Sequence, residues 1–201
     1  MDHEAILAAL RDNRYEARYF QTKEEAAAYL NETLDGAEIG FGDSATIAAM
    51  GLAKSLAAHN TVTDPSQYPD IRDFVAVGKK CLTTEYFLTS VNAMTESGIL
   101  VNMDGTGNRL AGSLFGHKKV FFVVGRNKIC PTLEDAVYRV RNVAAPRNAQ
   151  RFGKKTPCAV KGDKCYDCKS PERICNGLVI HYKKMSNMEM EVILIDEDLG
   201  L

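Results

Sequence analysis

Short, continuous apolar runs alternate with helix-like stretches along most of this chain. The runs lack the apolar–polar alternation of a half-exposed strand, and strands buried on both faces of a parallel sheet have this continuous pattern. The predicted strands of this kind are residues 37–41, 74–77, 99–101 and 120–124. The predicted helices between and after them are residues 45–58, 82–94 and 132–144. This order predicts βαβ units, and therefore an α/β fold with a Rossmann-like, mostly parallel sheet flanked by helices.

The two ends of the chain add to this plan. Residues 1–34 predict two helices that pack outside the sheet. Residues 146–177 lose the periodicity and form a basic Cys-rich loop, and the apolar runs at 178–182 and 192–195 then predict two strands that return to the sheet or form a hairpin beside it. A chain of 201 residues forms one sizeable core. We therefore expect one domain over residues 1–201, with the Cys-rich loop as an appendage.

Composition and charge narrow the classes of partner. The chain has 25 basic and 26 acidic residues, so its net charge of -1 supplies no field that would gather nucleic acid or an anionic membrane. No apolar run approaches the roughly 18 residues that span a bilayer, and the first residues lack the apolar core of a signal peptide. We expect a cytoplasmic protein with neither nucleic acid nor membrane as a partner.

Four of the six cysteines are crowded into one short segment with the spacing Cys158-x6-Cys165-x2-Cys168-x6-Cys175. With no export signal, reduced thiols that hold a metal are favoured over disulfides or unligated thiols. The central C-x-x-C pair gives two thiolates a natural grip on one centre, and the outer cysteines can complete four sulfur ligands. The spacing leaves zinc and a [4Fe–4S] cluster open, because both accept four thiolates. No organic cofactor is assigned.

The segment Gly40-Phe41-Gly42-Asp43-Ser44-Ala45-Thr46 lies between a predicted strand and a predicted helix. Gly42 permits a tight turn, while Ser44 and Thr46 can cap the helix and leave its N-terminal N–H groups for a phosphate or carboxylate. The segment also satisfies a loose dinucleotide-binding pattern, with Asp64 where a ribose-binding acid would stand. An ordinary capped turn, an anion site and an NAD site all remain open here.

Polar and small residues crowd around the predicted strand at 99–101. Buried amides and carboxylates are costly unless something pairs them, so this crowding favours a ligand pocket at the C-terminal edge of the sheet over a purely structural network. Arg109 is the natural fork for a carboxylate. The candidate ligand-binding residues in this segment are Asn92, Asn102, Gly105, Gly107, Asn108 and Arg109, and the candidate catalytic residues are Glu96 and Asp104.

Several long segments of this chain resemble the LUD (lactate utilisation, formerly DUF162) family. They are GDSAT, SVNAMTESGILVNMDGTGNRLAGSLFG, KKVFFVVGRNKI, RVRNVAAPRNAQR, TPCAVKGDKCYDCKSPERICN and VILIDEDLG. The resemblance implies the fold of the NagB, RpiA and CoA-transferase superfamily, with substrates at the C-terminal edge of the sheet and a homodimer as an expected assembly. Relatives belong to a bacterial iron–sulfur complex that oxidises L-lactate to pyruvate, which implies an iron–sulfur redox partner subunit.

The resemblance also bears on chemistry. Thr95-Glu96-Ser97-Gly98 is similar to the E-N-G segment in which CoA transferases keep their glutamate nucleophile, although Ser97 replaces the asparagine. The first hypothesis is a subunit of lactate or related small-carboxylate metabolism that binds a carboxylate or phosphate beside the four-cysteine site. The alternatives are a transferase or isomerase that uses Glu96 or Asp104, a non-catalytic ligand-binding or assembly module, and an NAD-binding protein.

Overall fold

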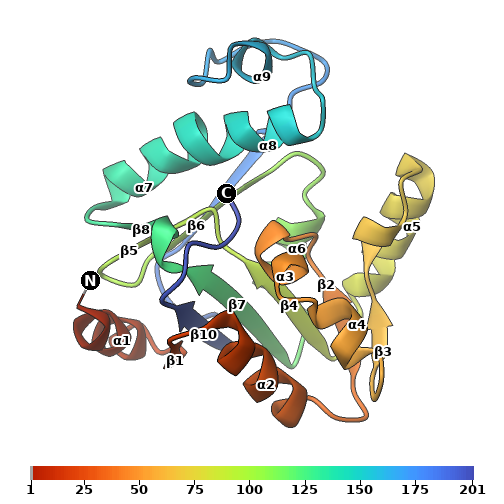
Figure 1. The fold of residues 1–201 in the computed structure, drawn as a ribbon, viewed down its shortest axis with the longest axis vertical. Coiled ribbons are helices and arrows are strands. Elements are labelled where there is room, and N and C mark those ends of the chain that lie inside the picture. The colour runs from red at the N-terminus through yellow and green to blue at the C-terminus, as the bar shows by residue number, and fades with distance from the viewer. Residues whose placement is uncertain (1) are drawn as a thin grey trace.

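The computed structural model describes residues 2–201 and contains two β-sheets (Figure 1). Every strand pair of the larger sheet is parallel, which confirms the predicted α/β class. Its six strands, in spatial order, are β1 (Glu16–Phe20), β10 (Glu189–Ile195), β7 (Lys119–Gly125), β4 (Tyr86–Ser90), β2 (Glu38–Phe41) and β3 (Thr61–Thr63). The smaller sheet is mixed, with β6 antiparallel to both of its neighbours. Its spatial order is β8 (Ile129–Cys130), β5 (Ala93–Thr95), β6 (Leu100–Asp104) and β9 (Gly177–His181).

Helices cover the sheets on both sides. The α-helices are α1 (His3–Asp12), α2 (Lys23–Thr33), α3 (Ala45–Ala49), α4 (Leu52–Leu56), α5 (Ile71–Cys81), α6 (Asn108–Leu114), α7 (Leu133–Arg139), α8 (Ala145–Arg151) and α9 (Pro157–Lys161). A π-helix (Val140–Ala144) joins α7 to α8, and the 3₁₀-helices η1 (Pro65–Gln67) and η2 (Arg126–Lys128) lie in loops. Figure 1 shows α7 and α8 crossing above the smaller sheet, with α9 at the far end of the molecule.

Three apolar clusters hold these layers together. One packs α2, α3 and α4 on one face of the larger sheet, through residues such as Leu30, Leu52 and Phe121. A second fills the opposite face, where Phe122 meets Leu100 of the smaller sheet and Leu10 of α1. The third lies between the smaller sheet and the α7 region. The larger sheet is therefore buried on both faces, as its continuous apolar strands predict.

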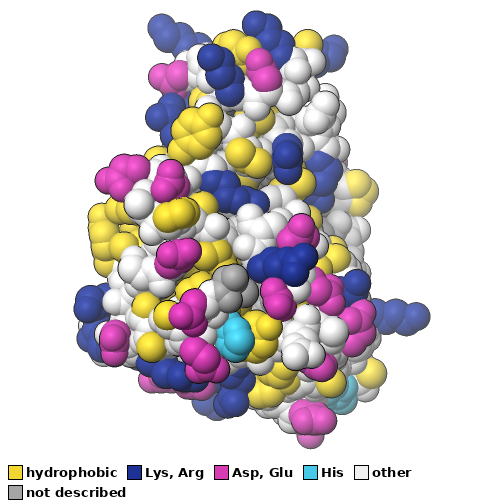
Figure 2. Space-filling model, turned by 60° about the vertical axis from the view of Figure 1, so that its left-hand side comes forward, with side chains coloured by type: hydrophobic (Ala, Val, Ile, Leu, Met, Phe, Trp, Pro, Cys, Tyr) yellow, Lys and Arg dark blue, Asp and Glu magenta, His cyan; other side chains and the backbone are white. Residues whose placement is uncertain are grey.

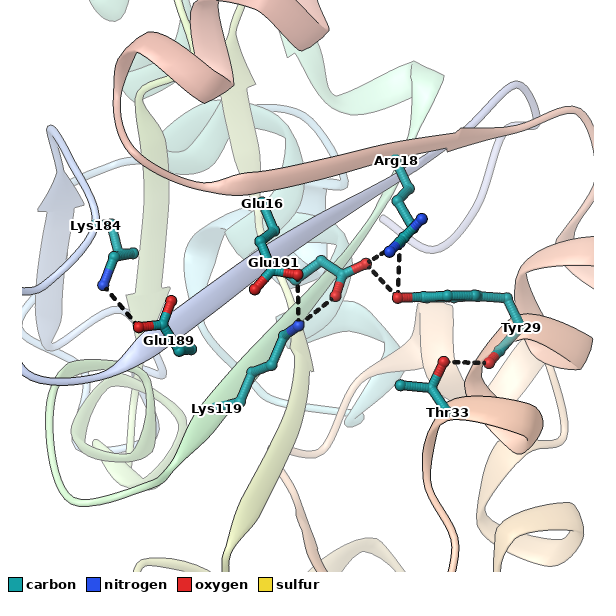
Figure 3. Close-up of polar contacts among 8 residues, drawn as sticks. All are labelled: Glu16, Arg18, Tyr29, Thr33, Lys119, Lys184, Glu189 and Glu191. Atoms are coloured by element: carbon teal, nitrogen blue, oxygen red, sulfur yellow. Dashed lines mark hydrogen bonds and ion pairs between the residues drawn. The ribbon is translucent and has the colours of Figure 1, made fainter.

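A buried carboxylate ties the edge of the larger sheet together (Figure 3). The side chain of Glu191 on β10 is fully buried and accepts hydrogen bonds from Arg18 Nε at 2.9 Å and Tyr29 Oη at 2.8 Å. Its second oxygen lies 2.7 Å from Lys119 Nζ on β7, which also reaches Glu16 at 2.8 Å. Charged side chains from three neighbouring strands and the Tyr29 hydroxyl of α2 thus meet at one point.

Two predicted elements have the opposite structure. Residues 74–77 lie in helix α5 rather than in a strand; Asp70 caps this helix, and its buried residues are Gly78 and Cys81. Residues 82–94 contain β4 and the start of β5 rather than a helix. Short apolar runs do not distinguish a buried strand from a helix by periodicity alone. The aromatic and β-branched residues of Phe87–Ser90, all buried, favour the strand that is observed.

Other predictions need smaller corrections. Gly51, at φ +66°, divides the predicted helix 45–58 into α3 and α4. Residues 1–34 contain both predicted helices and also β1, which the sequence reading missed. The strand at 99–101 belongs to the smaller sheet, and the two late strands lie in different sheets.

The helix predicted at 132–144 continues through Pro146 to Arg151. Proline cannot donate a helical hydrogen bond, and the π-helical turn directly before it accommodates that loss. Residues 146–151 therefore belong to this helix rather than to the Cys-rich loop.

Candidate functional site

A cavity of about 670 Å³ opens at the C-terminal ends of strands β2, β4, β6 and β7. Ligands of open α/β sheets bind at this edge, where loops of different strands meet. Helices α5 and α8 contribute further walls. Of the residues predicted to bind a ligand or act in catalysis, those that line the cavity are Gly42, Ser44, Thr46, Asn92, Asp104, Gly105, Asn108 and Arg109.

Gly40 in β2 and Gly42 in the turn after it are required by close packing. A Cβ on Gly42 would lie 2.7 Å from Thr89 Oγ1, and one on Gly40 would lie 2.9 Å from the Cys81 carbonyl oxygen. Ser44 accepts a hydrogen bond from Ile47 N at 3.3 Å and so caps α3. Helix α3 has five residues, which is too short for a strong N-terminal anion site. The glycines thus serve the close approach of β2 to its neighbours.

Asp64, the candidate ribose-binding acid, is occupied elsewhere. Its carboxylate accepts a hydrogen bond from Ser66 N at 2.9 Å and caps η1. The residues that line the cavity do not include Asp64. The geometry therefore gives no support to the NAD reading.

The loop after β6 holds Arg109 in place at the cavity wall. Asp104 accepts hydrogen bonds from Gly105 N at 2.8 Å and from Arg109 N at 3.1 Å, so its carboxylate shapes the loop. The Arg109 guanidinium donates to Asn92 Oδ1 at 3.2 Å and to the Met103 carbonyl at 2.6 Å. These contacts use one of the terminal nitrogens and leave the rest of the guanidinium for a ligand.

Lys128 is a residue of this cavity that the sequence analysis did not predict. It follows β7, is 3% exposed, and its Nζ donates to Thr46 Oγ1 at 2.7 Å and to Ser90 Oγ at 2.8 Å. Burial lowers the pKa of this amino group well below its usual value, and the positive charges of Arg139 and Arg109 lower it further. A lysine just after a buried parallel strand was the available signal, because that position faces the ligand edge of the sheet.

Basic groups outnumber acidic groups around the cavity. Arg109, Lys128, Arg151 and Lys154 line it, against Asp43 and Asp104. Within residues 2–201, none of these four cations lies within 4.0 Å of a carboxylate oxygen. The pKa of Asp43 is raised, because the effect of burial exceeds the lowering by the nearby positive charges of Arg151 and Arg109. The cavity thus offers an anion several basic groups that have no carboxylate partner among the described residues.

Three of the predicted site residues lie outside the cavity. Glu96 is exposed in the hairpin turn between β5 and β6, where its N–H donates to the Cys130 carbonyl at 2.9 Å. The same turn packs on α1, because Gly98 lies against Leu10 and Asn13. Asn102 is fully buried and accepts from Asn92 N at 2.9 Å, and Gly107, at φ +88°, precedes α6. Glu96 is therefore no candidate for chemistry in this cavity.

The four clustered cysteines line one small second cavity, together with residues of α8. Arg173 braces this segment by donating to the carbonyls of Cys168 at 2.7 Å and Cys175 at 3.1 Å. Burial raises the pKa of the Cys175 thiol, and Arg173 lowers it. Among residues 2–201, no three His, Cys, Asp or Glu side chains are arranged to hold a metal ion directly. The four sulfur donors share one cavity, and a metal centre there stays a prediction.

Comparison with known proteins identifies the family. The model of the LUD domain matches residues 4–195, nearly the whole chain. The protein belongs to the LUD-domain family. A search of curated proteins finds no match. A solved structure of a DUF162 family protein from Deinococcus radiodurans is similar, with a TM-score of 0.55 and 15% sequence identity over 96% of this chain and 95% of that one. At this identity the similarity supports the fold alone.

No helix in the described part of the chain is both long enough and apolar enough to cross a membrane.

Proposed function

We propose that this LUD-domain protein binds a small organic anion, a carboxylate of the lactate type or a phosphate, in the cavity at the C-terminal edge of its larger sheet. The observation that carries this proposal is the buried Lys128, whose amino group contacts only the hydroxyls of Thr46 and Ser90 among its hydrogen-bond partners in residues 2–201. A buried amine beside other cations is unfavourable unless an anion compensates it. We infer that the bound ligand supplies that negative charge.

Arg109 and Lys128 divide the recognition of the anion between them. A guanidinium can bind a carboxylate in a bidentate way, whereas an ammonium acts as a compact point charge. Asn92 and the Met103 carbonyl fix the direction of Arg109, and the Thr46 and Ser90 hydroxyls fix that of Lys128. Such preformed donors reduce the entropy cost of binding.

The Cys-rich loop is proposed to hold either zinc or an iron–sulfur cluster next to this anion site. Ile174 supports the connection, because it lines both the ligand cavity and the cysteine cavity. Zinc would brace the loop, and a cluster would supply one-electron transfer. Anaerobic purification followed by iron, sulfide and zinc analysis separates these two cases.

A partner subunit that exchanges electrons remains part of the proposal. Figure 2 shows basic side chains gathered at the end of the molecule that carries the Cys-rich segment. Residues 146–177 contain eight Lys or Arg residues and three Asp or Glu residues. A positive surface of this kind favours a partner with an acidic face.

Titration calorimetry with L-lactate and with inorganic phosphate tests the anion site on the full chain. Arg109→Gln and Lys128→Met should each weaken binding of the better anion by roughly tenfold to a hundredfold, because each removes a charge-assisted contact. Arg72→Gln is the matched control, since the Arg72 side chain is 90% exposed on α5 and lies outside the cavity lining. No binding of either anion, or equal losses in all three variants, would contradict the proposal.

A further inference from the structure

We propose that the natural ligand is larger than lactate: an organic anion whose charged end lies at Lys128 and Arg109 and whose flat, apolar end lies between α5 and α8. This inference rests on the proposed anion site and assigns the class of ligand that the site takes. The two ends correspond to two groups of residues in the lining of one cavity, which differ in polarity and in exposure.

The outer region of the cavity is apolar. Its wall includes Tyr68, Ile71 and Phe74 at the η1–α5 end and Phe152 at the end of α8. Three of these side chains are unusually exposed for their type: Tyr68 at 45%, Ile71 at 64% and Phe152 at 47%. Exposed apolar side chains that line a cavity mark a place where a ligand buries them.

The exposed fractions of the lining side chains indicate how the ligand is oriented in the cavity. Lys128, at the polar end, is 3% exposed, whereas the apolar side chains at the other end are about half exposed. A ligand would therefore enter with its anionic group first and leave its apolar group at the rim. Arg151 Cζ lies 4.4 Å from the Phe152 ring centroid, so a cation also covers part of this rim.

The volume argues against lactate as the whole ligand. A cavity of about 670 Å³ falls within the range of pockets that bury drug-sized molecules. Lactate offers a single methyl group to the rim and leaves its aromatic side chains uncovered. An aromatic ring on the anion would stack on Tyr68 or Phe152 and exclude water there.

Matched ligand pairs test the inference: L-lactate against 3-phenyllactate, and inorganic phosphate against phenyl phosphate. Each pair keeps an anionic group of the same kind, and the second compound adds a phenyl group to it. We expect the phenyl compound of at least one pair to bind roughly tenfold to a hundredfold more tightly, as burial of a ring predicts. Phe152→Ala and Tyr68→Ala should remove most of this gain and leave the affinity for the small anion unchanged.

Phe115→Ala is the matched control, because the Phe115 side chain is 81% exposed and lies outside the cavity lining. Affinities within about twofold in both pairs would overturn the inference, and so would a gain that persists in both rim variants. If none of the four anions binds, the proposed anion site fails and this inference fails with it. Binding of the small anions alone refutes only the apolar rim.

Discussion

The amino group of Lys128 lies 2.7 Å from Thr46 Oγ1 and 2.8 Å from Ser90 Oγ, and the charged groups that shift its pKa, Arg139 and Arg109, are both positive. Because its pKa is lowered in the folded state, the unfolded chain binds more protons at this site. The stability of the protein should therefore rise with pH between the lowered pKa and the usual value of 10.5. The slope from one such group is at most about 1.4 kcal/mol per pH unit.

Urea unfolding at a series of pH values tests the predicted rise of stability with pH. Lys128→Met should lose the rising slope and be more stable than the wild type at neutral pH, because no amine has to be buried uncharged. Lys118→Met should keep the slope, since the Lys118 side chain is 64% exposed and pairs with Glu85. Parallel pH profiles for the wild type and Lys128→Met would show that Lys128 is not the titrating group.

Glu191 is the opposite case, a buried charge with a cation close to each of its two oxygens (Figure 3). Glu191→Gln keeps the shape of the side chain but leaves Lys119 and Arg18 without their buried partner. We expect a loss of about 3 kcal/mol in the free energy of unfolding, measured by urea denaturation. Glu189→Gln on the same strand should cost less than about 1 kcal/mol, because Glu189 is 57% exposed and forms a surface pair with Lys184. Equal losses would contradict the role given to the buried network.

At the scale of elements, the apolar pattern predicted strands β2, β7 and β10 of the larger sheet and failed where a strand and a helix share one pattern, as at β4 and α5. The runs at 120–124 and 192–195 lie inside the sheet, and successive residues such as Phe122 and Val123 are buried in the clusters on its two opposite faces. The run at 74–77 is also continuously apolar but lies in a half-buried helix. Strand β1 escaped prediction because only Ala17 of its five residues is buried. An edge strand lacks the continuous apolar run from which the other strands were predicted.

The backbone after β6 packs so closely on the Cys-rich segment that adding one methyl group at Gly105 should disturb the contact. A Cβ on Gly105 would lie 2.9 Å from Ile174 Cα and 3.1 Å from its carbonyl oxygen, both backbone atoms that cannot rotate away. Gly105→Ala should cost about 1–3 kcal/mol of stability and weaken anion binding. Gly78→Ala in α5 should be neutral or slightly stabilising, because its Cβ would meet only Asn108 Cβ at 3.7 Å. A Gly105→Ala variant as stable as the wild type would mean that this contact relaxes freely.

At the scale of the whole molecule, the cavity gathers residues that the sequence keeps far apart. The segments around Ser44 and Arg109 could be predicted as parts of a ligand site, because polar residues there follow apolar strands. Tyr68 and Phe152 could not, since their place in the cavity depends on how α5 and α8 pack on the rest of the fold. The resemblance to the LUD family predicted the fold, but it did not predict that Tyr68 and Phe152 line the cavity.

The same packing joins the cysteine site to the ligand site. Helix α8 lines the cysteine cavity with Pro146 and Ala149 and the ligand cavity with Asn148 and Arg151. Asn176, next to Cys175, donates to the carbonyls of Asp104 at 3.0 Å and Gly105 at 3.1 Å. Loss of order in the Cys-rich loop should therefore spread to one wall of the ligand cavity.

Hydrogen exchange on the intact protein measures that spread. Cys168→Ser should speed amide exchange in residues 156–176, in α8 and at Asn176, while strand β7 stays protected, because β7 is held by the sheet rather than by the loop. Val160→Ser is the matched control: its side chain is 73% exposed in α9, and the cysteine cavity does not include it. Faster exchange confined to the loop, with α8 unchanged, would mean that the cysteine centre and the anion site are independent, and that neighbouring positions in the fold do not couple them.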